Sequence, residues 1–242
     1  MLKKLAIDVN FDVRSDTPIG KDPDQHSPTL RRYHQILWSK PLPSGKMFDL
    51  DISSKTSYLH HESELGKFSL SSDAATRTFV NAAKAAPVID LISEKDREKF
   101  SRQGYTIGGM MVFPGNRVDR KPTINGARGM HPRISDRLDL TLESIRRHYL
   151  GEPNPLENAL NRYSDFFALF ESFRGYVDFF LLQDLVSDDY GKVRFFTPFA
   201  DFTTSAIPQS VKEYESYREQ TLAFVAARNA RIHLYLKEMQ PA

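Results

Sequence analysis

Residues 211–239 read VKEYESYREQTLAFVAARNARIHLYLKEM, and this stretch decides how the C-terminal part of the chain folds. Its mostly apolar residues recur at intervals of three or four, the spacing that places side chains on one face of an α-helix. That face holds Tyr214, Tyr217, Thr221, Val225, Arg228, Ile232, Tyr235 and Met239. The pattern predicts one long helix over about 211–239.

The segments before this helix carry the same spacing. Apolar residues over 134–149 follow one another at intervals of three or four, and Gly151 ends the stripe. A second helical stripe covers 156–170, and the apolar run 177–186 is either a buried helix or a buried strand. The C-terminal half is therefore predicted to be helical.

The N-terminal half is mixed. Ser27-Pro28 is typical of a helix start, and the helix is expected to end at Trp38. Short runs with period-two alternation follow, which predict strands of a small antiparallel sheet. These runs are 48–52, 58–61 and 67–70, with a buried strand at 106–113 and helices at 74–86 and 88–100.

Together these elements predict an α+β fold that is mostly helical, with a small antiparallel sheet in the N-terminal half and a helical C-terminal half. A chain of 242 residues lies near the upper size for one hydrophobic core. We expect a single domain over 1–242, with lobes at 1–120 and 121–242.

Composition excludes several kinds of chemistry. The chain has no cysteine, so disulfides, thiolate zinc sites and cysteine nucleophiles are absent. It begins without an apolar run of signal-peptide length, and no 18-residue apolar stretch occurs, so we expect a cytoplasmic protein with no membrane partner. The net charge of +2 does not by itself demand a polyanionic partner.

The segment 123–133, TINGARGMHPR, suggests an anion-binding loop. Two glycines allow a tight loop whose backbone amides face a ligand, and the start of the next helix adds partial positive charge. Residues 117–148 contain seven arginines and one lysine against four acidic residues, a local excess of 8 − 4 = 4 positive charges. The predicted ligands of a phosphate, nucleotide or nucleic acid are Asn125, Arg128, His131, Arg133 and Arg137. The alternative is that these arginines pair with carboxylates such as Asp136 and Asp139.

A second motif lies on the final helix. Arg228-Asn-Ala-Arg-Ile-His233 resembles the arginine, polar residue, three residues, histidine motif of the higher-eukaryote-and-prokaryote nucleotide-binding superfamily. The resemblance implies a metal-independent ribonuclease with Arg228 and His233 as catalytic residues and Asn229 in support, and an RNA partner. Arg228 falls on the apolar stripe, where a charge is costly without a partner. The alternative is a buried ion pair for Arg228, with His233 on the rim.

Metal binding is not predicted. Asp22, Asp24 and His26 lie in a polar segment that is more typical of turns. His60 and His61 are adjacent in a predicted strand and so point to opposite faces. The sequence names no cofactor, and it leaves open whether the chain is an enzyme.

Several stretches spread over most of the chain resemble an uncharacterised bacterial family known only as a domain of unknown function. They are RSDTP (14–18), SPTLR (27–31), LWSKPLP (37–43), SELG (63–66), SSD (71–73), TIGG (106–109), DRLDLTL (136–142) and GYVDFFLLQD (175–184). The resemblance implies a single unit and transfers no activity. A non-catalytic interaction module, docking a partner through exposed aromatics such as Tyr217 or Tyr235, is therefore a further hypothesis.

Overall fold

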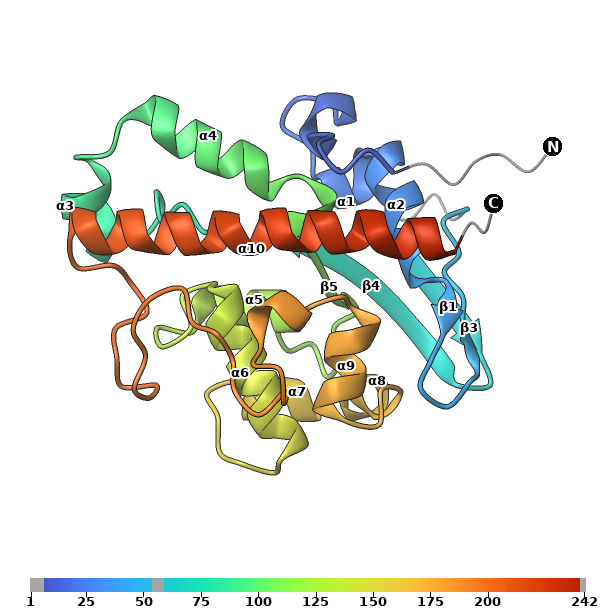
Figure 1. Ribbon diagram of the computed structural model, residues 1–242. Coiled ribbons are helices and arrows are strands. Elements are labelled where there is room, and N and C mark those ends of the chain that lie inside the picture. The colour runs from blue at the N-terminus through green and yellow to red at the C-terminus, as the bar shows by residue number, and fades with distance from the viewer. Residues whose placement is uncertain (1–6, 54–58, 240–242) are drawn as a thin grey trace.

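The computed structural model describes residues 7–53 and 59–239. Its central element is the helix α10 (Val211–Glu238), which confirms the predicted final helix. The side chain of Ser210 caps it by accepting a hydrogen bond from the backbone N–H of Glu213. Figure 1 shows α10 crossing the molecule, with α4 on one side and α5 to α9 on the other. Residues from both halves of the sequence therefore pack on one helix.

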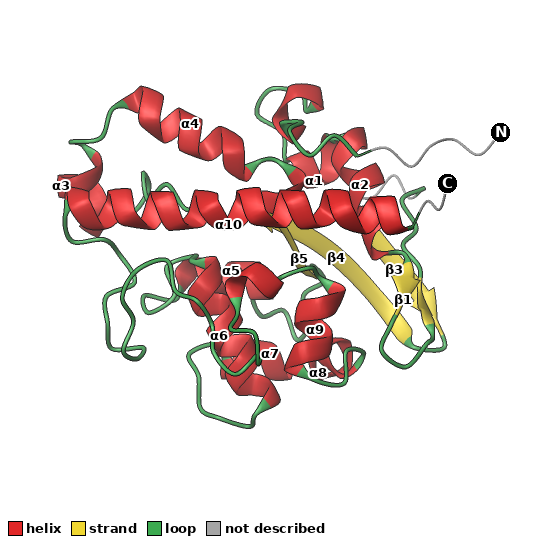
Figure 2. Cartoon of the chain, viewed as in Figure 1, coloured by secondary structure: helices red, strands yellow, loops and turns green. Residues whose placement is uncertain are grey.

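The other helices are mostly short (Figure 2). The α-helices are α1 (Pro23–His26), α2 (Pro28–Trp38), α3 (Ala86–Ile89), α4 (Glu94–Gly104), α5 (Ile124–Met130), α6 (Leu138–Tyr149), α7 (Glu157–Asn161), α8 (Ser164–Ala168) and α9 (Phe173–Phe179). The 3-10 turns are η1 (Val13–Asp16), η2 (Ala83–Ala85), η3 (Ile107–Gly109) and η4 (Gln183–Leu185). The helix at 28–38 is confirmed, and the one expected over 156–170 is divided into α7 and α8.

Two antiparallel sheets lie in the N-terminal half, as predicted. The strands are β1 (Lys40–Pro41), β2 (Met47–Phe48), β3 (Leu59–Ser63), β4 (Gly66–Ala74) and β5 (Met110–Pro114). β1 pairs with β2, and the larger sheet has the order β3-β4-β5, with Leu70 opposite both Leu59 and Pro114. Tyr58, at the start of one predicted strand, lies outside the described residues.

The prediction of a helix over 74–86 is wrong. β4 continues to Ala74, where it pairs with Met110, and the chain then runs without regular structure before η2. Strand pairing across the sheet overrides the local helical preference of the alanines. The strand expected over 106–113 begins later, because η3 occupies its first residues.

An aromatic core joins the elements. It includes Trp38 from α2, Phe166 from α8, and Phe179 and Phe180 from the end of α9, with ring centroids 5.0 to 6.4 Å apart in the contacting pairs. Tyr217 is fully buried, so the expectation that it is exposed for docking is wrong. The single domain over 1–242 and its two lobes stay predictions, as does the cytoplasmic location. No helix of residues 7–53 and 59–239 is long and apolar enough to span a membrane.

Candidate functional site

The predicted anion-binding loop is partly helical. Thr123 caps α5 by accepting a hydrogen bond from the backbone N–H of Gly126, so the segment expected to be a loop forms a helix of seven residues. Irregular backbone follows, because Ser135 and Asp136 have φ angles of 46° and 66°. That segment delays the start of α6 to Leu138 and turns the chain back toward Arg128.

Arg128 points into the interior. Its side chain is 1% exposed, and its Nη1 lies 2.7 Å from an oxygen of Asp73 and 3.0 Å from one of Asp136. Nε donates to the hydroxyl of Thr141, and Nη2 donates to the backbone carbonyl of Asp136. Every nitrogen of this guanidinium is engaged within the chain, so Arg128 fastens α5 to β4 and α6.

Arg137 is paired internally as well. Its Nε and Nη2 donate to the two carboxylate oxygens of Asp139 at 3.1 and 2.5 Å, and both side chains are buried. Asp139 also accepts the backbone N–H of Phe196 at 2.9 Å. The pair therefore holds the segment near Phe196 against α6. Pairing of Arg137 with Asp139 is the alternative that the sequence analysis considered.

The other predicted ligands lie nearer the surface. Asn125 packs toward β4, where its Nδ2 is 3.4 Å from the hydroxyl of Ser71. His131 and Arg133 line one pocket of about 540 Å³ together with Arg147. The structure thus brings His131 and Arg133 together and separates them from the interior arginines.

This pocket, termed the 131–133 pocket, presents hydrogen-bond donors. The backbone N–H of Arg133 donates to Nδ1 of His131, which leaves the ring proton of the neutral histidine on Nε2. Burial and the charge of Arg133 lower the pKa of His131. Arg147 is held by Glu143 at 2.8 Å and lies 4.9 Å from the ring centre of Phe202. The carboxylates that line the same pocket are Glu157 and Asp201.

Arg228 is fully buried on α10 and has no carboxylate partner within the described ranges. Its Nη1 donates to the carbonyls of Gly108 and Met110 at 3.0 and 2.9 Å, and its Nη2 donates to the carbonyl of Phe180 at 2.9 Å. The ring of Trp38 lies 5.7 Å away. Burial lowers the pKa of Arg228 to about 10, so the group stays charged at neutral pH. Backbone carbonyls therefore take the place of the buried ion pair considered from the sequence.

Asn229 and His233 point elsewhere. The side chain of Asn229 accepts the backbone N–H of Gly108 at 2.8 Å and donates to the hydroxyl of Thr106 at 3.0 Å. His233 is exposed and lines a cavity whose lining does not include Arg228. The motif residues thus have separate positions: Arg228 and Asn229 clamp η3, and His233 faces a pocket.

That cavity, termed the α4–α10 pocket, measures about 570 Å³. Its apolar wall comes from α10 and from the N-terminal segment, and its polar groups come from α4, α10 and the segments beside them. The lining residues are Val9, Asn10, Asp12, Arg102, Gln103, Thr106, Leu222, Val225, Ala226, Asn229, Ala230 and His233.

The charge of the pocket is unbalanced. Asp12 is neutralised by Arg14, whose Nε and Nη2 lie 3.0 and 2.8 Å from its oxygens. Burial opposes ionisation of Asp12, but its hydrogen bonds to Arg14 outweigh this and lower the pKa of the carboxyl. Arg102 makes no ion pair with any residue in the described part of the chain. Its charge also helps to lower the pKa of Asp12, so Arg102 acts on that carboxylate from a distance without forming an ion pair.

Sequence patterns did not indicate Arg102. The residue lies just beyond the charged helix predicted over 88–100, which the structure places at Glu94–Gly104 as α4. No motif contains it, and its neighbours Arg97 and Lys99 are equally basic. Only the packing of α4 against α10 selects it, since that contact sets which side chains of α4 face His233.

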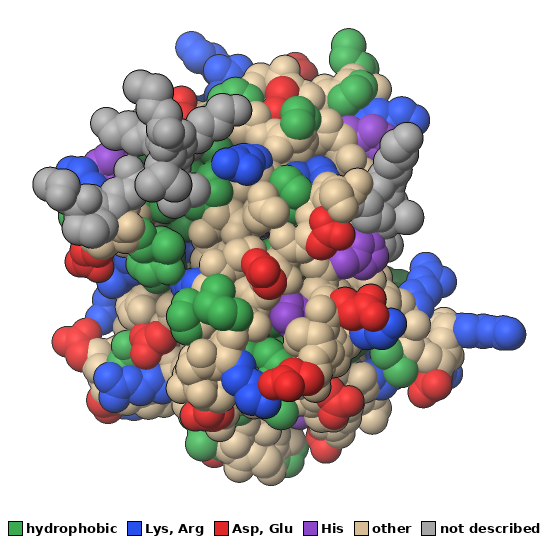
Figure 3. Space-filling model, turned by 90° about the vertical axis from the view of Figure 1, so that its right-hand side faces the viewer, with side chains coloured by type: hydrophobic (Ala, Val, Ile, Leu, Met, Phe, Trp, Pro, Cys, Tyr) green, Lys and Arg blue, Asp and Glu red, His purple; other side chains and the backbone are tan. Residues whose placement is uncertain are grey.

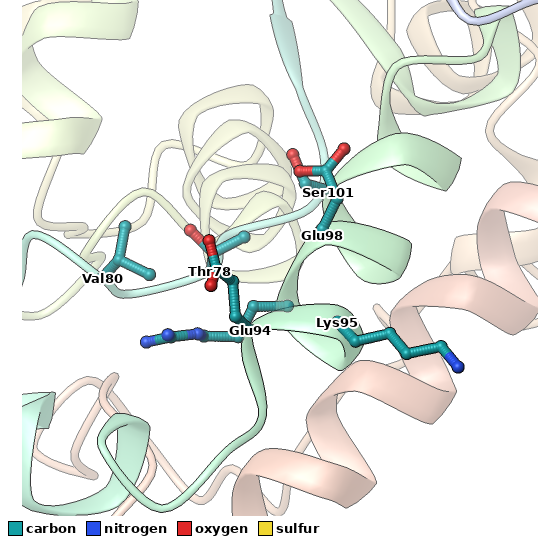
Figure 4. A pocket seen from close by; sticks show the side chains of 7 residues that line it. Thr78, Val80, Glu94, Lys95, Glu98 and Ser101 are labelled. Carbon is teal, nitrogen blue, oxygen red and sulfur yellow. The ribbon is translucent and has the colours of Figure 1, made fainter.

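A further cavity, of about 870 Å³, lies along α4 and is lined by its residues Glu94, Arg97 and Glu98. Figure 4 shows Glu94 of α4 next to Thr78 and Glu98 next to Ser101, while Lys95 extends away from these residues. Glu98 already pairs with Arg14 at 3.2 Å. None of the predicted site residues lines this cavity.

The clusters considered for metal binding are occupied by internal contacts. Asp24 accepts hydrogen bonds from the backbone N–H and the hydroxyl of Ser72. Asp22 caps α1, and His61 stacks on Phe48 with ring centroids 4.2 Å apart. Within residues 7–53 and 59–239, no group of three or more His, Asp or Glu side chains is arranged to hold an ion.

Comparison with known proteins gives one match. The model of a family of unknown function, DUF6994, covers residues 7–232. No curated protein and no solved structure matches the chain. The resemblance to an uncharacterised family is thus confirmed over most of the sequence, and bacterial origin stays a prediction.

Proposed function

The chain belongs to a family of unknown function, DUF6994, and from its geometry we propose that it binds a small phosphate-bearing ligand in the α4–α10 pocket. One observation carries this proposal: Arg102 from α4 and His233 from α10 line the same cavity, and Arg102 has no ion pair within the described residues. A guanidinium offers a planar set of donors that matches the oxygens of a phosphate.

The remaining lining fits the rest of a mononucleotide. Leu222, Val225 and Ala226 form an apolar wall suited to the face of a base. The side-chain amides of Asn10 and Gln103 can donate to and accept from polar edges of the ligand. A volume of about 570 Å³ lies within the range of small-molecule sites.

A small ligand suits the surface better than a long nucleic acid does. Figure 3 shows the face at the right of Figure 1, where Lys and Arg side chains are interspersed with Asp and Glu outside the atoms drawn in grey. Extended binding to a nucleic acid backbone uses a stripe of positive charge. The interspersed charges of this face do not form such a stripe.

The 131–133 pocket is the second candidate site for the same class of ligand. His131, Arg133 and Arg147 all line it, which supports the prediction from the sequence for the first two of these residues. Its own carboxylates, Glu157 and Asp201, offset the two arginine charges. Because Arg102 and His233 come from two long helices that pack against each other, we place the ligand in the α4–α10 pocket first.

RNA cleavage is a second candidate function, which is favoured because His233 lines the α4–α10 pocket. There His233 would remove the proton of a ribose 2′-hydroxyl, and Arg102 would stabilise the charge that develops on the phosphate. Arg228 would support this reaction only through packing, since its side chain is fully buried and its Nη1 and Nη2 donate to backbone carbonyls.

Isothermal titration with inorganic phosphate, AMP and a dinucleotide tests the binding proposal. Arg102→Ala should weaken AMP binding about tenfold or more, which corresponds to the loss of roughly 1.4 kcal/mol or more. Arg133→Ala, in the 131–133 pocket, and Arg32→Ala, an exposed arginine of α2, should leave the affinity unchanged. Loss of binding in Arg133→Ala alone would move the site to the 131–133 pocket, and no binding by the wild type would overturn the proposal.

Cleavage is tested separately. The wild type is incubated with a short RNA in the presence of a chelator, beside His233→Ala and Arg102→Ala. Metal-independent cleavage that both variants lose supports the ribonuclease function. If the RNA stays intact while the wild type still binds AMP, the ribonuclease function is excluded and the binding function remains.

A further inference from the structure

A fourth pocket, termed the Lys40 pocket, lies between β1, α9 and the end of α10. It measures about 520 Å³. Its lining residues are Lys40, Pro41, Leu42, Pro43, Ser172, Arg174, Gly175, Asp178, Phe179 and Tyr235. None of these residues belongs to the sites described above, and the pocket contains an unusual lysine.

Lys40 is surrounded by aromatic rings. Its Nζ lies 5.1 Å from the ring centre of Trp38, and 4.7 Å from the centres of both Phe179 and Tyr235. The residue is 7% exposed, and within the described residues it has neither an ion pair nor a hydrogen bond from its amine. A lysine this deeply buried ordinarily has a carboxylate partner.

The surroundings favour the neutral amine. Burial lowers the pKa of Lys40 from 10.5 to about 7, the charge of Arg228 adds to this effect, and Asp178 opposes it. Cation–π contacts with the rings favour the ammonium form. The cost of burying the charge is larger, so desolvation outweighs the rings.

The charged groups around the pocket are few. Arg174 is 71% exposed on its side chain and stands at the rim, 3.7 Å from an oxygen of Asp178. The other oxygen of Asp178 accepts hydrogen bonds from Tyr190 at 2.7 Å and Gln183 at 2.9 Å. The pocket therefore combines an unpartnered amine at its base with a guanidinium at its mouth.

We propose that Lys40 is a nucleophilic amine that condenses reversibly with the aldehyde group of a small anionic ligand, whose carboxylate binds Arg174. Amines desolvated in an apolar pocket are the usual means by which proteins form imines with carbonyl compounds. The Nζ lone pair adds to the carbonyl carbon, both nitrogen protons pass to the carbonyl oxygen, and that oxygen leaves as water. A C=N bond then joins Lys40 to the ligand, with no change of oxidation state. Asp178, the carboxylate in the lining, can carry the protons.

Reductive trapping tests the proposal. The full chain is treated with glyoxylate and cyanoborohydride at about pH 7, and carboxymethylated lysines are located by peptide mass spectrometry. Lys40 should react about tenfold or more faster than Lys95, an exposed lysine of α4, because burial lowers the pKa of Lys40 to about 7 and leaves much of its amine neutral at this pH. Its rate should level off above about pH 7.

Two variants make the test specific. Lys40→Met fills the aromatic site with an apolar side chain of similar length, so the protein should stay folded and lose the fast adduct. Arg174→Ala should slow the reaction of Lys40 with glyoxylate several-fold and leave its reaction with neutral propanal unchanged. Equal rates at Lys40 and Lys95, or a rate at Lys40 that keeps rising well above pH 7, would overturn the proposal. An unchanged glyoxylate rate in Arg174→Ala would overturn the role of Arg174.

Discussion

The side-chain oxygen of Asn229 accepts the backbone N–H of Gly108 at 2.8 Å and joins η3 to α10. A Cβ placed on Gly108 would lie 2.4 Å from that oxygen and 2.7 Å from the backbone carbonyl of Val225. The turn and the helix approach so closely only because residue 108 has no side chain. This contact lies next to the α4–α10 pocket, since Asn229 and Thr106 also line that pocket.

Gly108→Ala should therefore destabilise the protein. We expect a loss of about 1–3 kcal/mol in the free energy of unfolding, because the backbone of α10 cannot yield to the added methyl group. Urea unfolding of the variant measures it. Gly129→Ala is the control: at that position in α5 the nearest atom, an oxygen of Asp136, is 3.9 Å from the new Cβ. If both variants unfold at the same urea concentration as the wild type, η3 and α10 do not approach each other as closely as described.

Arg228→Met should lower the free energy of unfolding, whatever the function of the chain. It leaves the carbonyls of Gly108, Met110 and Phe180 without their donors, and each unsatisfied buried group costs about 1–3 kcal/mol. Chemical unfolding should show a total loss of about 3 kcal/mol or more. Arg231→Met provides the comparison, since Arg231 is part-exposed and pairs with Asp184, and such pairs contribute about 0–1 kcal/mol. Equal losses in the two variants would contradict the clamp formed by Arg228.

Asp24 should make stability fall as the pH rises from about 4 to 7. Its carboxyl group is buried, although the residue as a whole is half-buried, and burial raises its pKa from 3.8 to about 7. In that window the folded state binds a proton that the unfolded state has released, so raising the pH favours unfolding. Asp24→Asn should flatten this slope when urea unfolding is measured at about pH 5 and pH 8. Asp90→Asn, on the surface, should keep the wild-type slope.

Lys40 should have the opposite effect on stability at higher pH. Its pKa is about 7 in the folded state and near 10.5 in the unfolded chain, so between these values the unfolded state binds more protons and stability rises with pH. Lys40→Met removes this dependence. We expect the variant to exceed the wild type in stability most at about pH 6, with the difference shrinking toward pH 10. A difference that does not vary with pH would show that Lys40 titrates as an ordinary surface lysine.

Local sequence patterns correctly predicted the helices that depend least on contacts with distant parts of the chain. The spacing of apolar residues over 211–239 and the Ser27-Pro28 start of α2 are both confirmed, because helix periodicity and capping act within a few residues of the chain. Segment 74–86 was predicted to be helical. Its first residue, Ala74, instead ends β4, since pairing with Met110 of β5 satisfies its backbone groups, and the chain then runs without regular structure before η2.

For the candidate sites, the sequence by itself determined the residue types: an arginine excess over 117–148, an arginine on the apolar face of α10, and no cysteine. Only the tertiary structure decided which charges are free to meet a ligand. It pairs Arg128 with Asp73 from a distant strand and surrounds Arg228 with carbonyls of two other segments, whereas Arg102 and Lys40 line pockets without ion pairs among the described residues. The physical reason is that desolvation and pairing depend on groups far apart along the chain. Such groups come together only when α10 packs between the N-terminal and C-terminal parts of the fold.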